Sequence, residues 1–559
     1  MSESDLKRFT SEKRKKTSDN DEGLEPLREM SKTTISGGQQ VYQARQPQSP
    51  EDDQQKQPKR QFDVIAIGSG PGGYTAAIRC AQLGMSVAIV ERDLIGGHAV
   101  NWGCVPLNAM IASARIVRTV RESNLYAIDI PAHRIEFPRI ARRRDEAVKN
   151  VRQQVKSFLQ KYNIQVYIGI AELLDEHRIM VRSVKKYPYA NVYDSEGRSP
   201  YETDNFLPVQ NNTVIYGKNI VISTGVDYEF PKFVETNDKK SVDTTHLLWN
   251  RTVPETLTII GGGVLGCEIA SLYSLLMSKV TLLEKNSRLL KIMDESVSLA
   301  VESRLKEFGV KVLLNVDVEK VSKGEVFYRN KQLDTTQTLT AHRVVICTGR
   351  KPSFDYDLLK KIGIAVDKEN SRIVVEEDTC RTTKQNIYAC GSVVSSCWSW
   401  IPCAIRQGHL VANAICKNRI IEYDRESQFQ ISINSAAPYV INVIPAVAGV
   451  GSVPEFEDDC LVFTFDFKSN RRAIIDGQLW GFVKMWVSKD EPKKLFAVQL
   501  VHESAAEIIE YYGMIISLNL SLHDVCLLPF AHPTYSESVK QACEYVLGRS
   551  IEYEGAYLN

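Results

Sequence analysis

The stretch FDVIAIGSGPGG, residues 62–73, decides the fold of this chain. Its apolar first half predicts a short buried strand, and a helix is predicted to follow as far as Leu83. A second apolar strand, residues 86–91, ends in Glu91. The glycines between strand and helix have the spacing Gly-x-Gly-x-x-Gly and are Gly68, Gly70 and Gly73. Together these features predict a dinucleotide-binding βαβ unit.

The same pattern recurs between residues 257 and 284. A strand, a glycine turn, a helix over 267–276 and a strand ending in Glu284 follow one another. The glycines of this turn are Gly261, Gly263 and Gly266. Two such units imply two nucleotides, or one dinucleotide-binding domain that has been duplicated. The first unit is expected to hold FAD and the second NAD(H).

The acid at the end of each second strand is expected to bind a ribose. Glu91 would accept hydrogen bonds from the ribose hydroxyls of FAD. Glu284 would do the same for the nicotinamide cofactor and would repel a 2′-phosphate, which favours NAD(H) over NADP(H). Lys285 and Arg288 lie nearby and carry the opposite charge.

Bulk properties exclude several classes of function. The chain has 559 residues and a net charge of +1, so no global field favours nucleic acid or an anionic membrane. Residues 437–453 form the longest apolar candidate, but Asn442 and Pro445 interrupt it, and strand and turn are predicted instead of a membrane span. The 12 cysteines include no CxxC pair, which predicts no metal site and a reducing, cytoplasmic location, with an organelle left open.

Two segments stand outside this pattern. Residues 1–60 are rich in Ser, Gln and charged side chains and are predicted to be a disordered polar tail. Residues 185–216 are rich in Tyr, Asn and Pro and are predicted to form a long hairpin or surface loop.

Two places carry side chains with reactive chemistry. Cys104 precedes a helix predicted over 107–119, and a thiol at a helix N-terminus is expected to have a lowered pKa. His532 and Glu537 are five residues apart after a turn that contains proline. A carboxylate that holds an imidazole in one tautomer makes a general acid-base pair.

From about Gln61 to its C-terminus, the chain resembles the class I pyridine nucleotide-disulfide oxidoreductases, among them dihydrolipoamide dehydrogenase. The resemblance rests on the two glycine fingerprints, the segment GGHAVNWGCVP at 96–106, and a set of later motifs in the family's order. These later motifs are Ser223-Thr224-Gly225, Thr348-Gly349-Arg350, Ile387-Tyr388-Ala389-Cys390-Gly391 and His532-Pro533-Thr534 with Ser536-Glu537.

The resemblance implies an α/β fold with two Rossmann-like domains, for FAD and NAD, and a C-terminal α+β dimerisation domain. The implied boundaries are 61–235 for the first part of the FAD domain, 236–350 for the NAD domain, 351–430 for the central second part and 431–559 for the dimerisation domain. It also implies a homodimer in which His532 faces Cys104 of the other subunit. Further cofactor contacts are implied for Gly97, Thr224, Gly225, Gly349, Gly391 and Ser392.

The chain departs from the family around the flavin. The segment 96–106 has the frame of a motif whose two cysteines form a disulfide, but Ala99 stands at the position of the interchange cysteine. Asn108 stands where the family has a lysine. Glu268 corresponds to the carboxylate that pairs with this lysine, so Glu268 is expected to be unpaired and to have a raised pKa. Further departures are Ser392 in place of aspartate, Trp400-Ile401-Pro402 in place of Leu-Ala-His, and Ala446 in place of glutamate.

The resemblance and the departures together predict an FAD-dependent NADH oxidoreductase that transfers hydride between NAD(H) and FAD. Its single redox cysteine puts dithiol-disulfide exchange in doubt, and its electron acceptor is a small molecule or a protein. One alternative is a working dihydrolipoamide dehydrogenase in which Cys80, Cys397 or Cys403 substitutes for the missing thiol. The other is a non-catalytic binding partner. The candidate catalytic residues are Cys104, His532, Glu537 and Glu268.

Overall fold

The computed structural model describes residues 60–201, 206–235, 238–369, 371–394, 400–417, 437–455 and 460–552. The predicted tail, residues 1–60, lies outside these ranges except for Arg60. Residues 59–559 form one compact unit, which is the unit described below. No helix within the described ranges is long and apolar enough to cross a membrane.

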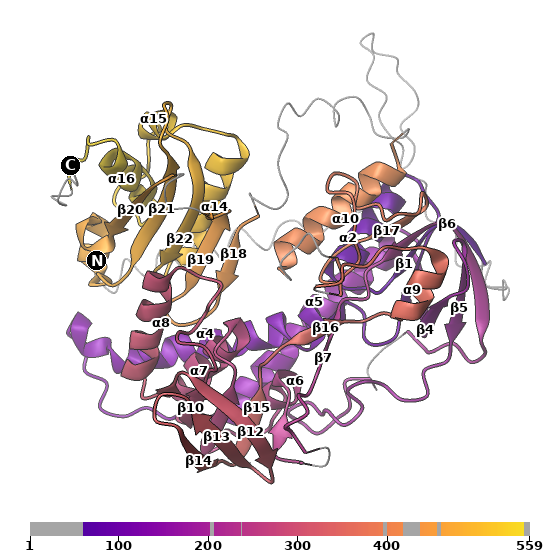
Figure 1. Cartoon of the computed structure of the whole chain (residues 1–559), viewed down its shortest axis with the longest axis horizontal. Coiled ribbons are helices and arrows are strands. Elements are labelled where there is room, and N and C mark those ends of the chain that lie inside the picture. The colour runs from indigo at the N-terminus through magenta and orange to yellow at the C-terminus, as the bar shows by residue number, and fades with distance from the viewer. Residues whose placement is uncertain are drawn as a thin grey trace, which may run out of the picture. The chain divides into compact units, whose positions relative to one another are not determined.

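The first sheet has seven strands in the order β3-β2-β1-β6-β5-β4, with β17 also paired to β6 (Figure 1). Strands β1, β2, β3, β6 and β17 run parallel, and β4 and β5 are antiparallel additions. The predicted strands and the predicted helix of the first unit are confirmed. The elements are β1 (Gln61–Ile67), α2 (Pro71–Gln82), β2 (Val87–Glu91), β3 (Gln165–Ile168), β4 (Ile170–Leu173), β5 (Arg178–Arg182), β6 (Thr213–Ile222) and β17 (Ile387–Ala389).

The second sheet repeats the parallel arrangement in the order β11-β10-β9-β15-β8. In both sheets the second strand of the βαβ unit lies beside the first, and a later strand closes the other side of the first strand. The predicted duplication is therefore confirmed. The elements are β8 (Ser241–Val242), α6 (Thr244–Leu248), β9 (Thr256–Ile260), α7 (Val264–Leu275), β10 (Lys279–Leu283), α8 (Glu295–Glu307), β11 (Lys311–Leu313) and β15 (Arg343–Ile346).

Smaller elements surround the second sheet. A three-stranded antiparallel sheet and a two-stranded ribbon, β16-β7, complete this part of the chain. A short helix then leads back toward β17. These elements are β7 (Val226–Tyr228), β12 (Val316–Ser322), β13 (Glu325–Asn330), β14 (Thr335–Thr340) and β16 (Arg350–Pro352). Two helices lie with the first sheet instead: α9 (Tyr356–Ile362) shares its core, and α10 (Ile401–Ile415) packs against α2 (Figure 1).

The C-terminal part is an antiparallel five-stranded sheet in the order β18-β19-β22-β21-β20, accompanied by helices. The apolar run 437–453 forms β18, a turn and β19, as predicted. The predicted fold class is thus confirmed. The elements are β18 (Tyr439–Ile441), β19 (Val447–Gly451), β20 (Cys460–Asp466), η3 (Phe467–Ser469), α13 (Arg471–Asp476), β21 (Phe482–Ser488), β22 (Leu495–Val501), α14 (Ala505–Ser517), α15 (Leu522–Cys526) and α16 (Glu537–Val546).

The segment that follows β2 forms four helices, and the first two contain most of the segment 96–106. They are α3 (Gly97–Asn101), α4 (Cys104–Arg121), η1 (Ser123–Tyr126) and α5 (Phe137–Lys161). The Nδ2 of Asn101 donates to the carbonyl oxygens of Leu94, Ile95 and Gly97 at 3.0–3.2 Å, which ties the short helix to the chain before it. Helix α4 begins at Cys104, three residues earlier than predicted, so the thiol lies in its first turn.

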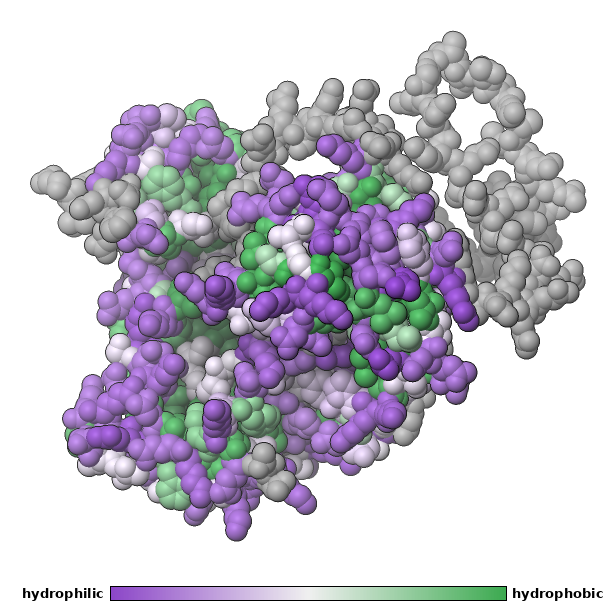
Figure 2. Space-filling view, turned by 45° about the vertical axis from the view of Figure 1, so that its right-hand side comes forward, coloured by the Kyte–Doolittle hydropathy of each residue, from purple (hydrophilic) through white to green (hydrophobic). Residues whose placement is uncertain are grey.

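The tyrosine-rich insertion, predicted as a long hairpin or a surface loop, is a long loop between the antiparallel strands β5 and β6, and its described residues before β6 form no strand. Its rings pack on Trp102 of the segment 96–106. The ring centroids of Trp102 and Tyr189 are 4.7 Å apart, and Tyr187 stacks on Tyr201 at 4.1 Å. The face of the molecule in Figure 2 is mostly polar, with apolar residues gathered in separate patches.

Candidate active site

The two glycine turns have the same geometry. A Cβ atom on Gly73 would lie 2.0 Å from the carbonyl oxygen of Gly68, and one on Gly266 would lie 1.9 Å from that of Gly261. No side chain fits at these distances, so each third glycine lets its helix pack against its strand. The first glycines, Gly68 and Gly261, have φ of 99° and 108°, a conformation that L residues rarely adopt.

The two predicted ribose acids also occupy equivalent places. An oxygen of Glu91 accepts the backbone N–H of Ser69 at 2.7 Å, and an oxygen of Glu284 accepts that of Gly262 at 2.6 Å. Both carboxylates are buried. Each acid therefore holds the glycine turn of its own unit.

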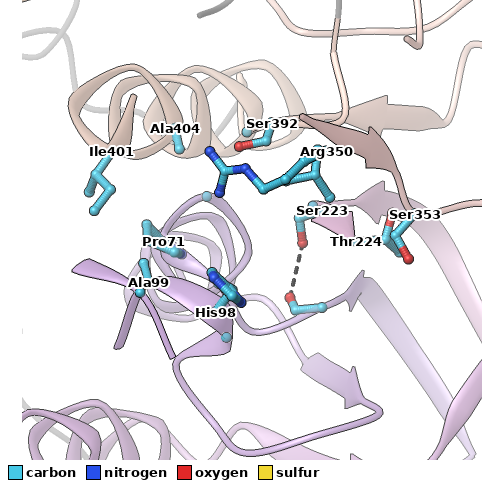
Figure 3. A pocket seen from close by; sticks show the side chains of 18 of the residues that line it. Pro71, His98, Ala99, Ser223, Thr224, Arg350, Ser353, Ser392, Ile401 and Ala404 are labelled. Carbon is cyan, nitrogen blue, oxygen red and sulfur yellow. Dashed lines mark hydrogen bonds between the residues drawn. The ribbon is translucent and has the colours of Figure 1, made fainter. Parts of the chain in front are cut away.

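One large cavity, of about 1620 Å³, joins the first unit to the start of the second. The cavity is lined by Glu268 of α7 and by most of the predicted residues of the first unit: Gly68, Gly70, Glu91, Gly97, Cys104, Thr224, Gly225, Gly391 and Ser392. Figure 3 shows Arg350 reaching between helix α3, which carries His98 and Ala99, and the segment that carries Ser392. The other predicted site residues do not line the cavity: Gly73, Gly261, Gly263, Gly266, Glu284, Gly349, His532 and Glu537.

The residues of the first unit fit a dinucleotide with a flavin. The N-terminus of α2 opens into the cavity beside Gly70, where a Cβ atom would meet nothing within 4 Å, so a pyrophosphate can approach the backbone. The Oγ1 of Thr224 is buried in the lining without a hydrogen-bond partner. A buried hydroxyl of this kind is expected to bond to a ligand. Ser392 lines the same cavity in place of the family's aspartate.

Cys104 differs from its predicted state. Burial, together with the charge of Glu268, raises the pKa of the Cys104 thiol, and only the hydrogen bond from Asn108 lowers it. The predicted lowering of this pKa is therefore wrong, because desolvation outweighs the helix N-terminus. The Nδ2 of Asn108 donates to the Cys104 carbonyl at 2.9 Å and to Sγ at 3.4 Å. The thiol is largely protonated at neutral pH.

The three candidate substitute thiols have different positions. Cys104 forms no disulfide with any described residue. Cys80 is buried on α2 and does not line the cavity, whereas Cys403 is buried on α10 and contributes to the lining. Cys397 lies outside the described residues.

Glu268 has the raised pKa that was predicted. Burial on α7 raises the pKa of its carboxyl to about 7. The carboxyl is not without partners, however, since Oε1 accepts the backbone N–H of Asn442 at 2.7 Å and its Nδ2 at 3.3 Å. Asn442 follows β18 of the C-terminal sheet, and nothing in the sequence indicated that it would reach α7.

His532 and Glu537 form the predicted pair. The Nδ1 of His532 lies 2.8 Å from Oε1 of Glu537, and Oε2 of Glu537 accepts the backbone N–H of Thr534. The imidazole is 51% exposed. The pair thus lies on the surface of its own chain and away from that chain's cavity.

Sequence reasoning missed a network of polar side chains beside the segment 96–106. Asp93 accepts hydrogen bonds from Trp102 Nε1 and from the Tyr201 hydroxyl, both at 2.8 Å, and burial raises its pKa to about 6. His98 lies in the cavity lining with its Nε2 3.4 Å from the hydroxyl of Tyr228, and burial lowers its pKa to about 4. The position of His98 beside Ala99 was the only available signal.

Comparisons with known proteins agree with this geometry. A family model described as pyridine nucleotide-disulphide oxidoreductase matches residues 62–408, and the model of that family's dimerisation domain matches residues 437–543. The dihydrolipoyl dehydrogenase of Geobacillus stearothermophilus is 28% identical over 500 residues, which cover 88% of this chain and 97% of that protein. The leghemoglobin reductase of Glycine max is 28% identical and covers 86% of each chain.

Solved structures give the same fold. The HOCl-induced flavoprotein disulfide reductase RclA from Escherichia coli has a TM-score of 0.67 at 25% identity, covering 86% of this chain and 98% of that one. Its Cu(II) complex has a TM-score of 0.70 at 24% identity, with 87% and 99% covered. The chain therefore belongs to the pyridine nucleotide-disulphide oxidoreductase family, whose members are FAD-dependent enzymes that use NAD(H).

Proposed function

We propose that this protein is an NADH oxidoreductase in which FAD takes electrons from NADH and passes them to an acceptor without a dithiol relay. The observation that carries the proposal is the single cavity lined by the first glycine turn, by Ala99 and Cys104, and by the start of α7 at Val264 and Leu265. A flavin and a nicotinamide placed along these residues would meet in one cavity.

In this proposal the residues of the first unit hold FAD. The N–H groups at the start of α2 bind its pyrophosphate, Glu91 its ribose, and Thr224 and Ser392 its remaining polar groups. FAD supplies reversible two-electron chemistry when it is bound. We also keep the predicted domain boundaries and the cytoplasmic location as predictions.

The second unit would bind NAD(H) in preference to NADP(H). In this proposal the carboxylate of Glu284 binds the ribose and would repel a 2′-phosphate. The guanidinium of Arg288 is already engaged by the carbonyl of Met293 at 2.6 Å and by Ser298 Oγ at 2.8 Å. These contacts occupy the Arg288 guanidinium, which is then not available to bind a 2′-phosphate. Of the two cations near Glu284 in the sequence, only Lys285 remains.

The loss of the relay follows from two positions. Ala99 supplies no sulfur, and a disulfide cannot form from Cys104 alone. The raised pKa of Cys104 keeps its sulfur protonated, whereas thiol exchange requires a thiolate.

We further propose a homodimer in which the His532–Glu537 pair serves the partner's cavity. The family's dimerisation domain is present at residues 437–543. The pair is ordered by its own hydrogen bonds but lies outside the lining of its own chain's cavity, which supports a role across an interface.

An anaerobic titration with NADH tests the absence of a relay. The FAD-loaded protein should take up one NADH per flavin, since only the flavin stores electrons. The variant Ala99→Cys, which restores the second sulfur of the motif, should take up two. Uptake of two by the unmodified protein would favour a substitute thiol. A colourless protein that FAD cannot reconstitute would contradict the proposal and favour the binding partner.

A further inference from the structure

The amide side chain of Gln407 is buried beside the cavity without lining it. Gln407 lies on α10 and is 1% exposed, and its Oε1 accepts the backbone N–H of Gly391 at 2.7 Å. Gly391 and Ser392, which we call the Gly391 turn, both line the cavity, whereas Gln407 does not. Any effect of this amide on a bound cofactor therefore passes through the Gly391 turn.

The Gly391 turn begins where the chain leaves the first sheet. Just after β17, the N–H of Cys390 still bonds to the carbonyl oxygen of Ile222 on β6, at 3.0 Å. The N–H of Gly391 lies beyond these ladder bonds and is bonded to Gln407 instead. The carbonyl oxygen of Gly391 accepts the N–H of Val394 at 3.1 Å. With a φ of 80°, Gly391 has a conformation that side chains disfavour, and these two hydrogen bonds fix the direction in which the chain turns.

Helix α10, which carries Gln407, packs directly on α2. A Cβ atom on Gly408 would lie 2.7 Å from the carbonyl oxygen of Gly72 and 2.9 Å from the Cβ atom of Thr75. The two helices therefore touch at the start of α2, where the pyrophosphate is proposed to bind. Because Gln407 directly precedes Gly408, its side chain connects the Gly391 turn to a helix that is held closely against α2.

We propose that Gln407 is a positioning residue for FAD, whose Oε1 holds the Gly391 turn at the distance from α2 at which both contact the cofactor. This inference rests on the proposed function, which assigns Ser392 and the start of α2 to FAD. Serine has a shorter, uncharged side chain than the family's aspartate, so a contact from Ser392 depends closely on the position of its backbone. A turn that is loose in the FAD-free protein has to be ordered when FAD binds, which weakens binding.

Titration of the FAD-free protein with FAD, followed by flavin fluorescence, measures this role without turnover. Gln407→Met keeps the length of the side chain but removes the acceptor, which leaves the buried N–H of Gly391 unpaired. We expect FAD to bind about tenfold more weakly to this variant. Gln407→Glu keeps an oxygen acceptor at the same reach and should bind FAD within about threefold of the unmodified protein. Equal affinity of Gln407→Met and the unmodified protein would overturn the inference, and so would a Gln407→Glu variant as weak as Gln407→Met.

A second buried glutamine provides the matched control. Gln499 on β22 is 5% exposed, its Oε1 accepts the backbone N–H of Asp294 at 2.9 Å, and neither residue lines the cavity. Gln499→Met should lower the urea midpoint of the FAD-free protein, as Gln407→Met does, but should leave the affinity for FAD unchanged. Equal losses of affinity in the two methionine variants would make the role of Gln407 merely structural and would overturn the inference. If Gln407→Met does not fold, Gln407→Asn, whose amide is one methylene shorter, takes its place.

The variant Ser392→Ala tests whether Gln407 acts through the Gly391 turn. Alone, it should weaken FAD binding by about threefold to tenfold, because a hydrogen bond is lost. Added to Gln407→Met, it should weaken binding by less than about twofold further, since the displaced turn has already lost this contact. Losses that multiply in the double variant would overturn the positioning role. An unmodified protein that binds no FAD would instead contradict the proposed function itself.

Discussion

The buried carboxyl of Glu268 should make the stability of the protein depend on pH. Its pKa is about 7 in the folded chain and near 4.5 when the chain is unfolded. The folded state therefore binds the proton more tightly, and stability is full below about pH 4.5 and is lost as pH rises through 7. Glu268→Gln, which stays neutral, should be more stable than the unmodified protein above pH 7 by up to about 3 kcal/mol.

Urea unfolding of the FAD-free protein at pH 5 and pH 8 measures this difference. The advantage of Glu268→Gln should be small at pH 5 and larger at pH 8. Glu325→Gln changes an exposed carboxyl on β13 and should show no such trend. An advantage of Glu268→Gln that is equal at both pH values would contradict the shifted pKa.

The thiol of Cys104 should react slowly with iodoacetamide at pH 7. Its raised pKa leaves little thiolate, so we expect a rate more than about tenfold below that of an unstructured cysteine peptide. Asn108→Ala removes the hydrogen bond that lowers this pKa and should slow the reaction further. If access alone limited the reaction, the smaller side chain would speed it up instead. Mass spectrometry of the peptide that contains Cys104 gives the rate.

These two residues show where residue-scale prediction works. The raised pKa of Glu268 followed from the lost lysine and an expected dry site, and burial on α7 confirms it. The lowered pKa of Cys104 was inferred from its own helix alone. Its environment is set by burial and by Glu268, which lies on α7 of the second unit, and no local pattern encodes that interaction.

At the scale of elements, the tyrosine-rich insertion should stabilise the segment 96–106. Asp93 is half-buried and receives one hydrogen bond from Trp102 and one from Tyr201. Tyr201→Phe removes one donor from this carboxyl and should lower the free energy of unfolding by about 1–3 kcal/mol. Tyr193→Phe, on the exposed part of the insertion, should change it by less than about 0.5 kcal/mol. Equal urea midpoints for Tyr201→Phe and the unmodified protein would contradict this role.

Elements themselves were predicted well where their signals are local. The strands and glycine turns of both units follow from apolar runs and from glycines at positions where a Cβ atom would collide with backbone. The insertion was predicted only as a hairpin or a surface loop, because its packing on Trp102 depends on side chains brought together from distant parts of the chain. The stacking of the Trp400 ring on the Tyr439 ring was not predicted, for the same reason.

At the scale of the whole molecule, helix α14 presents an apolar face that a monomer would leave in water. Tyr511, Met514 and Leu518 are 38%, 51% and 36% exposed, and their spacing of three and four residues puts them on one side of the helix. Leu527 and Leu528, just after α15, are 84% and 46% exposed. Large apolar side chains gathered in this way mark an interface, and the family's dimerisation domain contains all five.

Met514→Asp should therefore dissociate the dimer. A carboxylate in the centre of an apolar interface is desolvated without a partner, which costs several kcal/mol at each of two symmetric positions. Sedimentation equilibrium should give twice the 63.0 kDa of one chain for the unmodified protein and a single chain for the variant. Leu207→Asp, which alters a 77% exposed leucine in the insertion, should remain a dimer.

Because His532 is proposed to serve the partner's cavity, the Met514→Asp monomer should still bind FAD but should lose any step that needs this imidazole. A monomeric unmodified protein would contradict both the interface on α14 and the shared site.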